Sequence, residues 1–117
     1  MDIAGIAEHI GARLWMPGSG RSVAVNRVYA GDRMSDLLNA VTDTTLLVTN
    51  LSNATLVRFI ELMDAPAVCL LNGAEPEDAI VSAAQRHGAA LMVSPADMFE
   101  TCGRLYQVLR GGAAPAP

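Results

Sequence analysis

The chain has 117 residues, of which 51% are hydrophobic and only 4% aromatic, and its formal net charge is −4. This length suits a single domain with a core of aliphatic side chains. All eight basic residues are arginines, spread from Arg13 to Arg110 without a cluster, which argues against nucleic-acid and anionic-membrane partners. Because the start does not resemble a secretion signal and no apolar run could span a bilayer, we expect a cytoplasmic protein.

The first part of the chain predicts a helix, a short strand, a turn, a strand and a second helix. Residues 2–12 carry Ile3, Ile6 and Ile10 on one helical face and end near Gly11. A short strand over 13–16, a turn over 17–22 and a strand over 25–30 follow. The next helix is expected to begin near Asp32, and its apolar stripe consists of Met34, Leu37, Leu38 and Val41.

Three strand–helix repeats are expected in the rest of the chain. The strands are the apolar runs 44–50, 66–72 and 89–94. After the first, Ser52 or Asn53 is suited to cap a helix with the stripe Leu56, Phe59, Ile60 and Met63. The second is followed by a helix within 75–88, with Pro76 at its first position, Arg86 and His87 in its last turn and Gly88 as its stop.

The last helix is expected within residues 94–109. Ser94, Pro95 and Asp97 are placed as its cap, its first residue and its capping-box partner. We expect one domain over residues 1–110 and a disordered tail over 111–117, because the tail has nothing to bury.

These repeats predict an α/β fold with three layers, in which helices cover both faces of a mostly parallel sheet. The helices of such a sheet start beyond the carboxyl ends of its strands, so the polar corners after the strands should gather at one edge. This edge is the expected ligand site. Its candidate residues are Gly31, Asp32, Arg33, Ser35, Thr49, Asn50, Asn72, Gly73 and Ser94.

The corner Gly31–Arg33 has two interpretations. In the first, Gly31 permits the turn and Asp32 caps the following helix, which stabilises it by about 1 kcal/mol. In the second, Arg33 and the helix amides hold an anion, although the Asp32 carboxylate would repel a phosphate. The other polar residues of the edge would then donate hydrogen bonds to a small ligand, but turns and caps favour the same residue types.

No catalytic constellation is visible, so we expect neither an enzyme nor a cofactor or metal site. The chain contains no lysine, which excludes a phosphate loop and a Schiff base. His9 and His87 lie on helices, and the usual role of such histidines is an exposed or partly packed one. Cys69 and Cys102 have no metal-ligand spacing and are expected to be small buried hydrophobic residues.

Four stretches together resemble the DRTGG domain family in its small stand-alone form. They are VYAGDRMSDLLN, LLVTN, VCLLNGAEPED and VSPADMFETCGRLYQVL, and the resemblance covers about residues 1–110. It implies an α/β domain similar to the amino-terminal domain of HPr kinase/phosphorylase and to modules in CBS-domain pyrophosphatases and long phosphotransacetylases. Met34-Ser35-Asp36 stands where the family name has Thr-Gly-Gly, so ligand contacts through those glycines do not carry over.

The resemblance implies a regulatory role, because in those larger proteins the domain is regulatory or dimerising. It also implies a protein partner, such as a hydrogenase, a sensor kinase or a metabolic enzyme. Our leading hypothesis is a non-enzymatic module that forms a homodimer and binds a partner protein and a small anionic ligand. The alternatives are a sensor of adenine nucleotides or phosphate around Gly31–Arg33, and an enzyme in its own right; kinase activity is rejected because the phosphate loop is missing.

Overall fold

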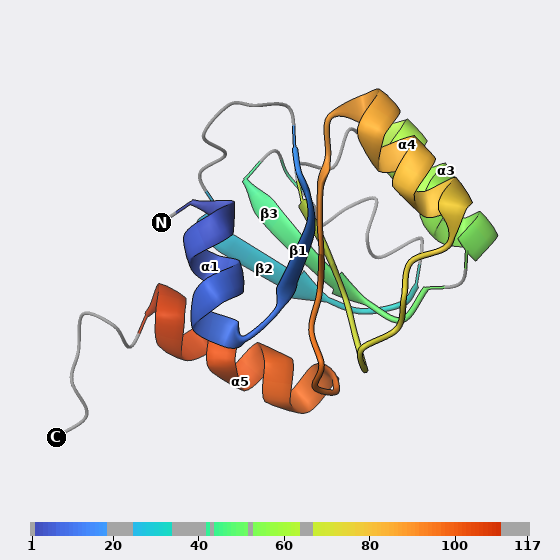
Figure 1. Cartoon of the computed structure of the whole chain (residues 1–117). Coiled ribbons are helices and arrows are strands. Elements are labelled where there is room, and N and C mark those ends of the chain that lie inside the picture. Colours follow the sequence, from blue (N-terminus) through green and yellow to red (C-terminus); the bar gives the residue numbers. More distant parts are fainter. Residues whose placement is uncertain are drawn as a thin grey trace, which may run out of the picture.

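The computed structural model describes residues 2–18, 25–33, 42, 44–51, 53–63 and 67–110. The predicted helix after Asp32, with its stripe and Ser35, lies outside these residues, as do Ser52 and the tail 111–117. The described part has an α/β fold (Figure 1). Its helices are α1 (Ile3–Ile10), α3 (Asn53–Met63), α4 (Asp78–His87) and α5 (Met98–Leu109). Its strands are β1 (Arg13–Pro17), β2 (Arg27–Ala30), β3 (Thr45–Thr49), β4 (Ala67–Leu70) and β5 (Ala90–Val93).

The five described strands form one sheet in the order β1-β5-β4-β3-β2. Strands β2 to β5 are parallel to one another, whereas β1 runs antiparallel to β5 at one edge. All residues of β3, β4 and β5 are buried, which is why their sequences do not alternate and are apolar apart from Thr45 and Thr49 at the ends of β3. The predicted mostly parallel sheet is confirmed.

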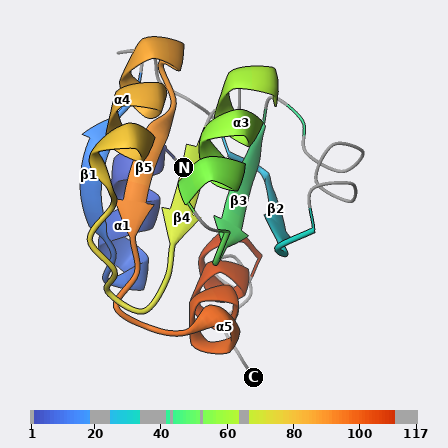
Figure 2. The ribbon, with the colours of Figure 1, turned by 90° about the vertical axis from the view of Figure 1, so that its right-hand side faces the viewer.

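Helices cover both faces of this sheet, as Figures 1 and 2 show. On one face, α3 and α4 pack side by side, and their buried residues include Leu56, Phe59 and Ile80. On the other face, α1 and α5 bury Ile6, Ile10 and Leu105 against the sheet. The three-layer prediction is therefore confirmed, and the core lies in two apolar layers, one on each side of the sheet.

The predicted stops of the first and third described helices are correct. Gly11 and Gly88 have φ values of 74° and 68°, in the left-handed region that glycine tolerates best, and each follows the last residue of its helix.

The predicted starts of α4 and α5 are wrong by a few residues. Helix α4 begins at Asp78 after the cap residue Glu77, so Pro76 lies before the cap rather than inside the helix. Helix α5 begins at Met98, and Asp97 is its cap because the Asp97 carboxylate accepts the Glu100 amide at 2.9 Å. Ser94 and Pro95 therefore belong to the connection that precedes this helix.

Candidate functional site

The polar corners after the parallel strands lie at one edge of the sheet, as the parallel arrangement requires. Since Arg13 pairs with Val93, the last residue of β5, the start of the antiparallel strand β1 reaches the same edge, at which the parallel strands end. We call this edge the rim. It consists of Gly11–Arg13, Gly31–Arg33, Thr49–Leu51, Asn72–Glu75 and Ser94–Pro95.

At the β2 end of the rim, Asp32 joins two neighbouring strand ends. Its Oδ1 accepts the Thr49 hydroxyl at 2.9 Å and the Asn50 amide at 2.7 Å. Thr49, which is fully buried, also accepts the Leu51 amide at 3.0 Å. The observed role of the Asp32 carboxylate is thus to fix the end of β3, and the helix that we expected it to cap lies outside the described residues.

At the β4 end, Asn72 and Gly73 form a tight turn. Both have positive φ values, 60° and 66°, and the Ala74 amide donates to the Leu71 carbonyl at 3.2 Å. Their own amides donate to carbonyls of the β5–α5 connection: Asn72 to Ala96 at 2.9 Å and Gly73 to Ser94 at 2.8 Å. These two amides therefore hold the connection in place.

Ser94 is fully buried beneath this turn. Its hydroxyl lies 2.7 Å from that of Thr101 on α5 and accepts the Ala96 amide at 3.2 Å. In this position Ser94 couples the end of β5 to the first turn of α5, and its burial sets it apart from the exposed residues Arg33 and Asn50.

The structure brings the described candidate residues together as two groups along the rim. Gly31, Asp32 and Arg33 follow β2 and lie beside Thr49 and Asn50 at the end of β3, where the Gly31 amide donates to the Val48 carbonyl at 3.0 Å. Asn72, Gly73 and Ser94 form the second group, at the ends of β4 and β5. From β2 to β1 the rim spans four interstrand spacings, or about 19 Å. The rim is wide enough for more than one small ligand.

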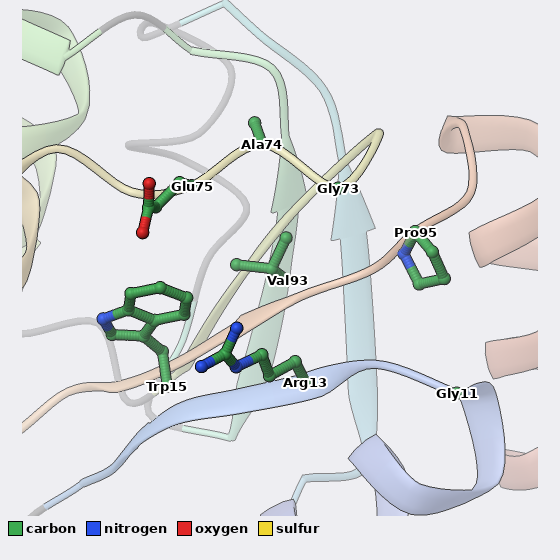
Figure 3. Close-up of a pocket in the computed structure, with 8 residues that line it drawn as sticks. All are labelled: Gly11, Arg13, Trp15, Gly73, Ala74, Glu75, Val93 and Pro95. Carbon is green, nitrogen blue, oxygen red and sulfur yellow. The ribbon is translucent and has the colours of Figure 1, made fainter.

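A cavity of about 210 Å³ opens at the β1 end of the rim (Figure 3). It is lined by Gly11, Arg13, Trp15, Gly73, Ala74, Glu75, Val93 and Pro95. Sequence reasoning missed Arg13, Trp15 and Glu75 as site residues. An antiparallel pairing of residues 13–16 with the last strand would have placed Arg13 at the rim, but the sequence alone leaves the direction of that strand open.

A second, larger cavity of about 730 Å³ lies between β2 and α5. Its lining includes Arg27, Val28, Leu105, Tyr106 and Arg110. This groove has both arginine and apolar side chains in its lining and lies along a strand at the edge of the described sheet. It is a second candidate surface, on the α5 side of the sheet, and it reaches Ala30, the residue before Gly31.

The two cysteines are free thiols packed in the layer beneath α1 and α5. Burial raises the pKa of Cys69 from 9.0 to about 12, and burial also raises the pKa of Cys102. Both thiols therefore stay protonated near neutral pH, which is the opposite of what a nucleophile needs. The expectation of small buried hydrophobic residues is correct for Cys69, whereas Cys102 is partly exposed.

Within the described ranges, no group of three His, Cys, Asp or Glu side chains is arranged to hold a metal ion. None of the helices in those ranges combines the length and hydropathy needed to cross a bilayer.

No protein-family model matches the sequence, and no curated protein sequence matches it either. Among solved structures, the chain is similar to the CBS and DRTGG domains of the regulatory region of Clostridium perfringens pyrophosphatase, complexed with the activator diadenosine tetraphosphate. The TM-score is 0.78 at 16% identity, and the match covers 91% of this chain and 46% of that one. The fold is DRTGG-like. The chain spans about half the length of this structural neighbour.

Proposed function

We propose that this chain is a non-catalytic regulatory module that binds a small anionic ligand at the rim. The similarity to a regulatory region that was solved with its activator carries this proposal. We also propose that residues 1–110 act as one domain.

The hydrogen-bonded groups of the rim hold its corners together, and its arginines support the binding of an anion. The carboxylate of Asp32, the hydroxyl of Ser94 and the amides of Asn72 and Gly73 hold neighbouring corners together. Two arginines, Arg13 and Arg33, are exposed at opposite ends of the rim, where a guanidinium can pair with a carboxylate or a phosphate. A rim that these hydrogen bonds hold together, with an arginine at each end, suits recognition of an anion.

A sensor of adenine nucleotides or phosphate around Gly31–Arg33 is the second candidate. It is favoured by the diadenosine tetraphosphate in the structural neighbour. In this arrangement Arg33 and the amides that follow Gly31 hold the anion. The Asp32 carboxylate, which is exposed, would oppose a polyphosphate at the same place.

Thermal unfolding with a panel of adenine nucleotides, diadenosine tetraphosphate and inorganic phosphate tests the nucleotide candidate. We expect a rise in melting temperature that Arg33→Ala abolishes and that the control Arg58→Ala, an exposed arginine on α3, leaves intact. No shift with any of these ligands, or a shift that survives in Arg33→Ala, contradicts it.

We further propose that the module forms a homodimer through α5 and that it binds a protein partner, such as a hydrogenase, a sensor kinase or a metabolic enzyme. Phe99 and Tyr106 on α5 are 86% and 64% exposed, which is unusual for large apolar side chains on one helix. Leu62 on α3 is 65% exposed and belongs to the opposite layer.

Size-exclusion chromatography with light scattering tests the dimer. The wild type and Leu62→Glu should have the mass of a dimer, whereas Phe99→Glu and Tyr106→Glu should shift it to that of a monomer. A wild-type monomer at micromolar concentration would remove the dimer from the proposal while leaving ligand binding at the rim unaffected.

A further inference from the structure

The edge strand β1 contains a β-bulge at Trp15. Leu14 pairs with Met92 and Met16 pairs with Leu91, so Trp15 is an extra residue on β1. As a result two consecutive side chains, Trp15 and Met16, pack on the face that α3 and α4 cover, while Leu14 packs on the other face. The bulge thereby turns the indole of Trp15 toward the cavity at the rim (Figure 3).

Trp15 in turn holds the guanidinium of Arg13. The Arg13 Cζ lies 4.6 Å from the centroid of the Trp15 ring, a cation–π contact. A guanidinium that lies over a ring keeps the N–H groups of its edge available, and these match the two oxygens of a carboxylate. Arg13 therefore presents a guanidinium that is able to pair with an anion, on a side chain that the Trp15 ring already holds in place.

Glu75 supplies the opposite charge from the β4–α4 connection. It lines the same cavity, and in Figure 3 its carboxylate is directed toward the Trp15 ring. Within the part of the chain that the structure describes, Glu75 makes no hydrogen bond and no ion pair, with Arg13 or any other residue. A cation and an anion thus line one cavity without neutralising each other directly.

The size and the floor of the cavity limit what can bind there. Its volume of about 210 Å³ lies below the usual range of pockets for drug-sized ligands, so it suits a small molecule. The rest of the lining is largely apolar: Val93 and Trp15 lie near the two charges, and Pro95 lies on the far side of Val93 (Figure 3). Glu77 and Asp78 follow Glu75 closely, and these carboxylates together disfavour a polyphosphate.

We propose that this cavity is a binding site for a small apolar α-amino acid. The ligand carboxylate pairs with Arg13, its ammonium pairs with Glu75, and its side chain packs on Val93 and Pro95. This site lies at the opposite end of the rim from Arg33, so it goes beyond the proposed function and does not depend on the nucleotide candidate.

Trp15 makes the proposal directly measurable, because it is the only tryptophan of the chain. The probes are the twenty protein amino acids, each titrated singly against the intrinsic fluorescence of the whole chain. L-Leucine is then compared with 4-methylpentanoate, which lacks the ammonium group, and with 3-methylbutylamine, which lacks the carboxylate. We expect a saturable response to a small apolar amino acid, and at least tenfold weaker binding of both single-charge analogues.

Three variants assign the two charges. Arg13→Gln should abolish the response, and calorimetry should confirm this loss because the substitution also alters the surroundings of the indole. Glu75→Gln should remove the preference for the amino acid over its carboxylate analogue. The control Glu61→Gln, on the exposed surface of α3, should behave as the wild type. Far-ultraviolet circular dichroism checks that each variant is folded.

Two results would overturn the proposal: no saturable response to any of the twenty amino acids at millimolar concentration, or equal binding of the amino acid and both analogues. Stabilisation by nucleotides through Arg33, without an amino-acid response, would overturn this inference while the nucleotide candidate stands. An amino-acid response that needs Arg13, without any nucleotide effect, would support it while the nucleotide candidate fails.

Discussion

The contact between Asp32 and the end of β3 gives a direct test of how the rim is built. Asp32→Ala removes the acceptor of two hydrogen bonds, from the Thr49 hydroxyl and the Asn50 amide. The Thr49 side chain is fully buried, so its hydroxyl would lose its partner where little water can replace it.

The expected loss follows from these bonds. A hydrogen bond to a charged group contributes about 1.5–3 kcal/mol, but Asp32 itself is exposed and water competes for its oxygens. We therefore expect Asp32→Ala to lower the free energy of unfolding by about 2 kcal/mol. Asp32→Asn keeps an oxygen acceptor and loses only the charge, so its cost should be about 1 kcal/mol.

Urea unfolding, followed by circular dichroism, measures both variants. The control is Glu8→Ala, an exposed acid on α1, which should change the free energy of unfolding by less than about 0.5 kcal/mol. In a double-mutant cycle, Asp32→Ala and Thr49→Val should show a coupling of about 1 kcal/mol. A loss below about 0.5 kcal/mol for Asp32→Ala, or additive effects in the cycle, would refute the view that this carboxylate fixes the β3 end.

Four further predictions concern the core and the helices. Ser94→Ala should cost about 1–2 kcal/mol in urea unfolding because it breaks a buried hydrogen-bonded pair, and a neutral effect would contradict this. Burial raises the pKa of Cys69 from 9.0 to about 12, so above pH 9 this thiol ionises in the unfolded state but stays protonated in the folded state. The free energy of unfolding should therefore fall as the pH rises from 9 towards 12. A thiol reagent at pH 8 should accordingly label Cys102 before Cys69, and the reverse order would argue against it. Gly88→Ala should lower the free energy of unfolding by about 1 kcal/mol, because φ at Gly88 is 68°. Gly103→Ala should raise it by about 0.5–1 kcal/mol, because an added Cβ would meet nothing within 4 Å and alanine favours a helix. Equal effects of the two substitutions in urea unfolding would contradict both expectations.

The apolar runs made the parallel sheet predictable from the sequence. The residues of β3, β4 and β5 are buried on both faces, and only a strand covered on both faces needs an uninterrupted apolar sequence. The helix stop at Gly88 was also predictable. Helices often end in a residue with left-handed φ, such as the 68° of Gly88, and glycine tolerates this conformation best.

The start of α5 shows where sequence reasoning fell short. Ser94 and Asp97 are both good caps, and the sequence does not say which one is used. The structure uses Asp97 as the cap because the Ser94 hydroxyl is engaged with Thr101 inside the core. Such tertiary hydrogen bonds decide between two locally equivalent choices.

The sequence predicted that polar corners gather at the rim, but it did not predict which residues line the cavity there. Parallel strands bring their carboxyl ends to one edge whatever their side chains are, so the rim followed from the fold. Arg13, Trp15 and Glu75 meet because β1 turns back beside β5 and carries a bulge. Neither the direction of a short edge strand nor a bulge has a clear signature in a single sequence.

Recognition of a small ligand at the rim of the sheet is open to measurement by nuclear magnetic resonance. Amide chemical shifts are mapped while amino acids, adenine nucleotides and inorganic phosphate are added in turn. We expect shifts confined to the rim, at Gly11–Arg13 and Ala74–Glu75 or at Gly31–Arg33 and Asn50. Shifts confined to the groove between β2 and α5, or no shifts with any of these ligands, would contradict it.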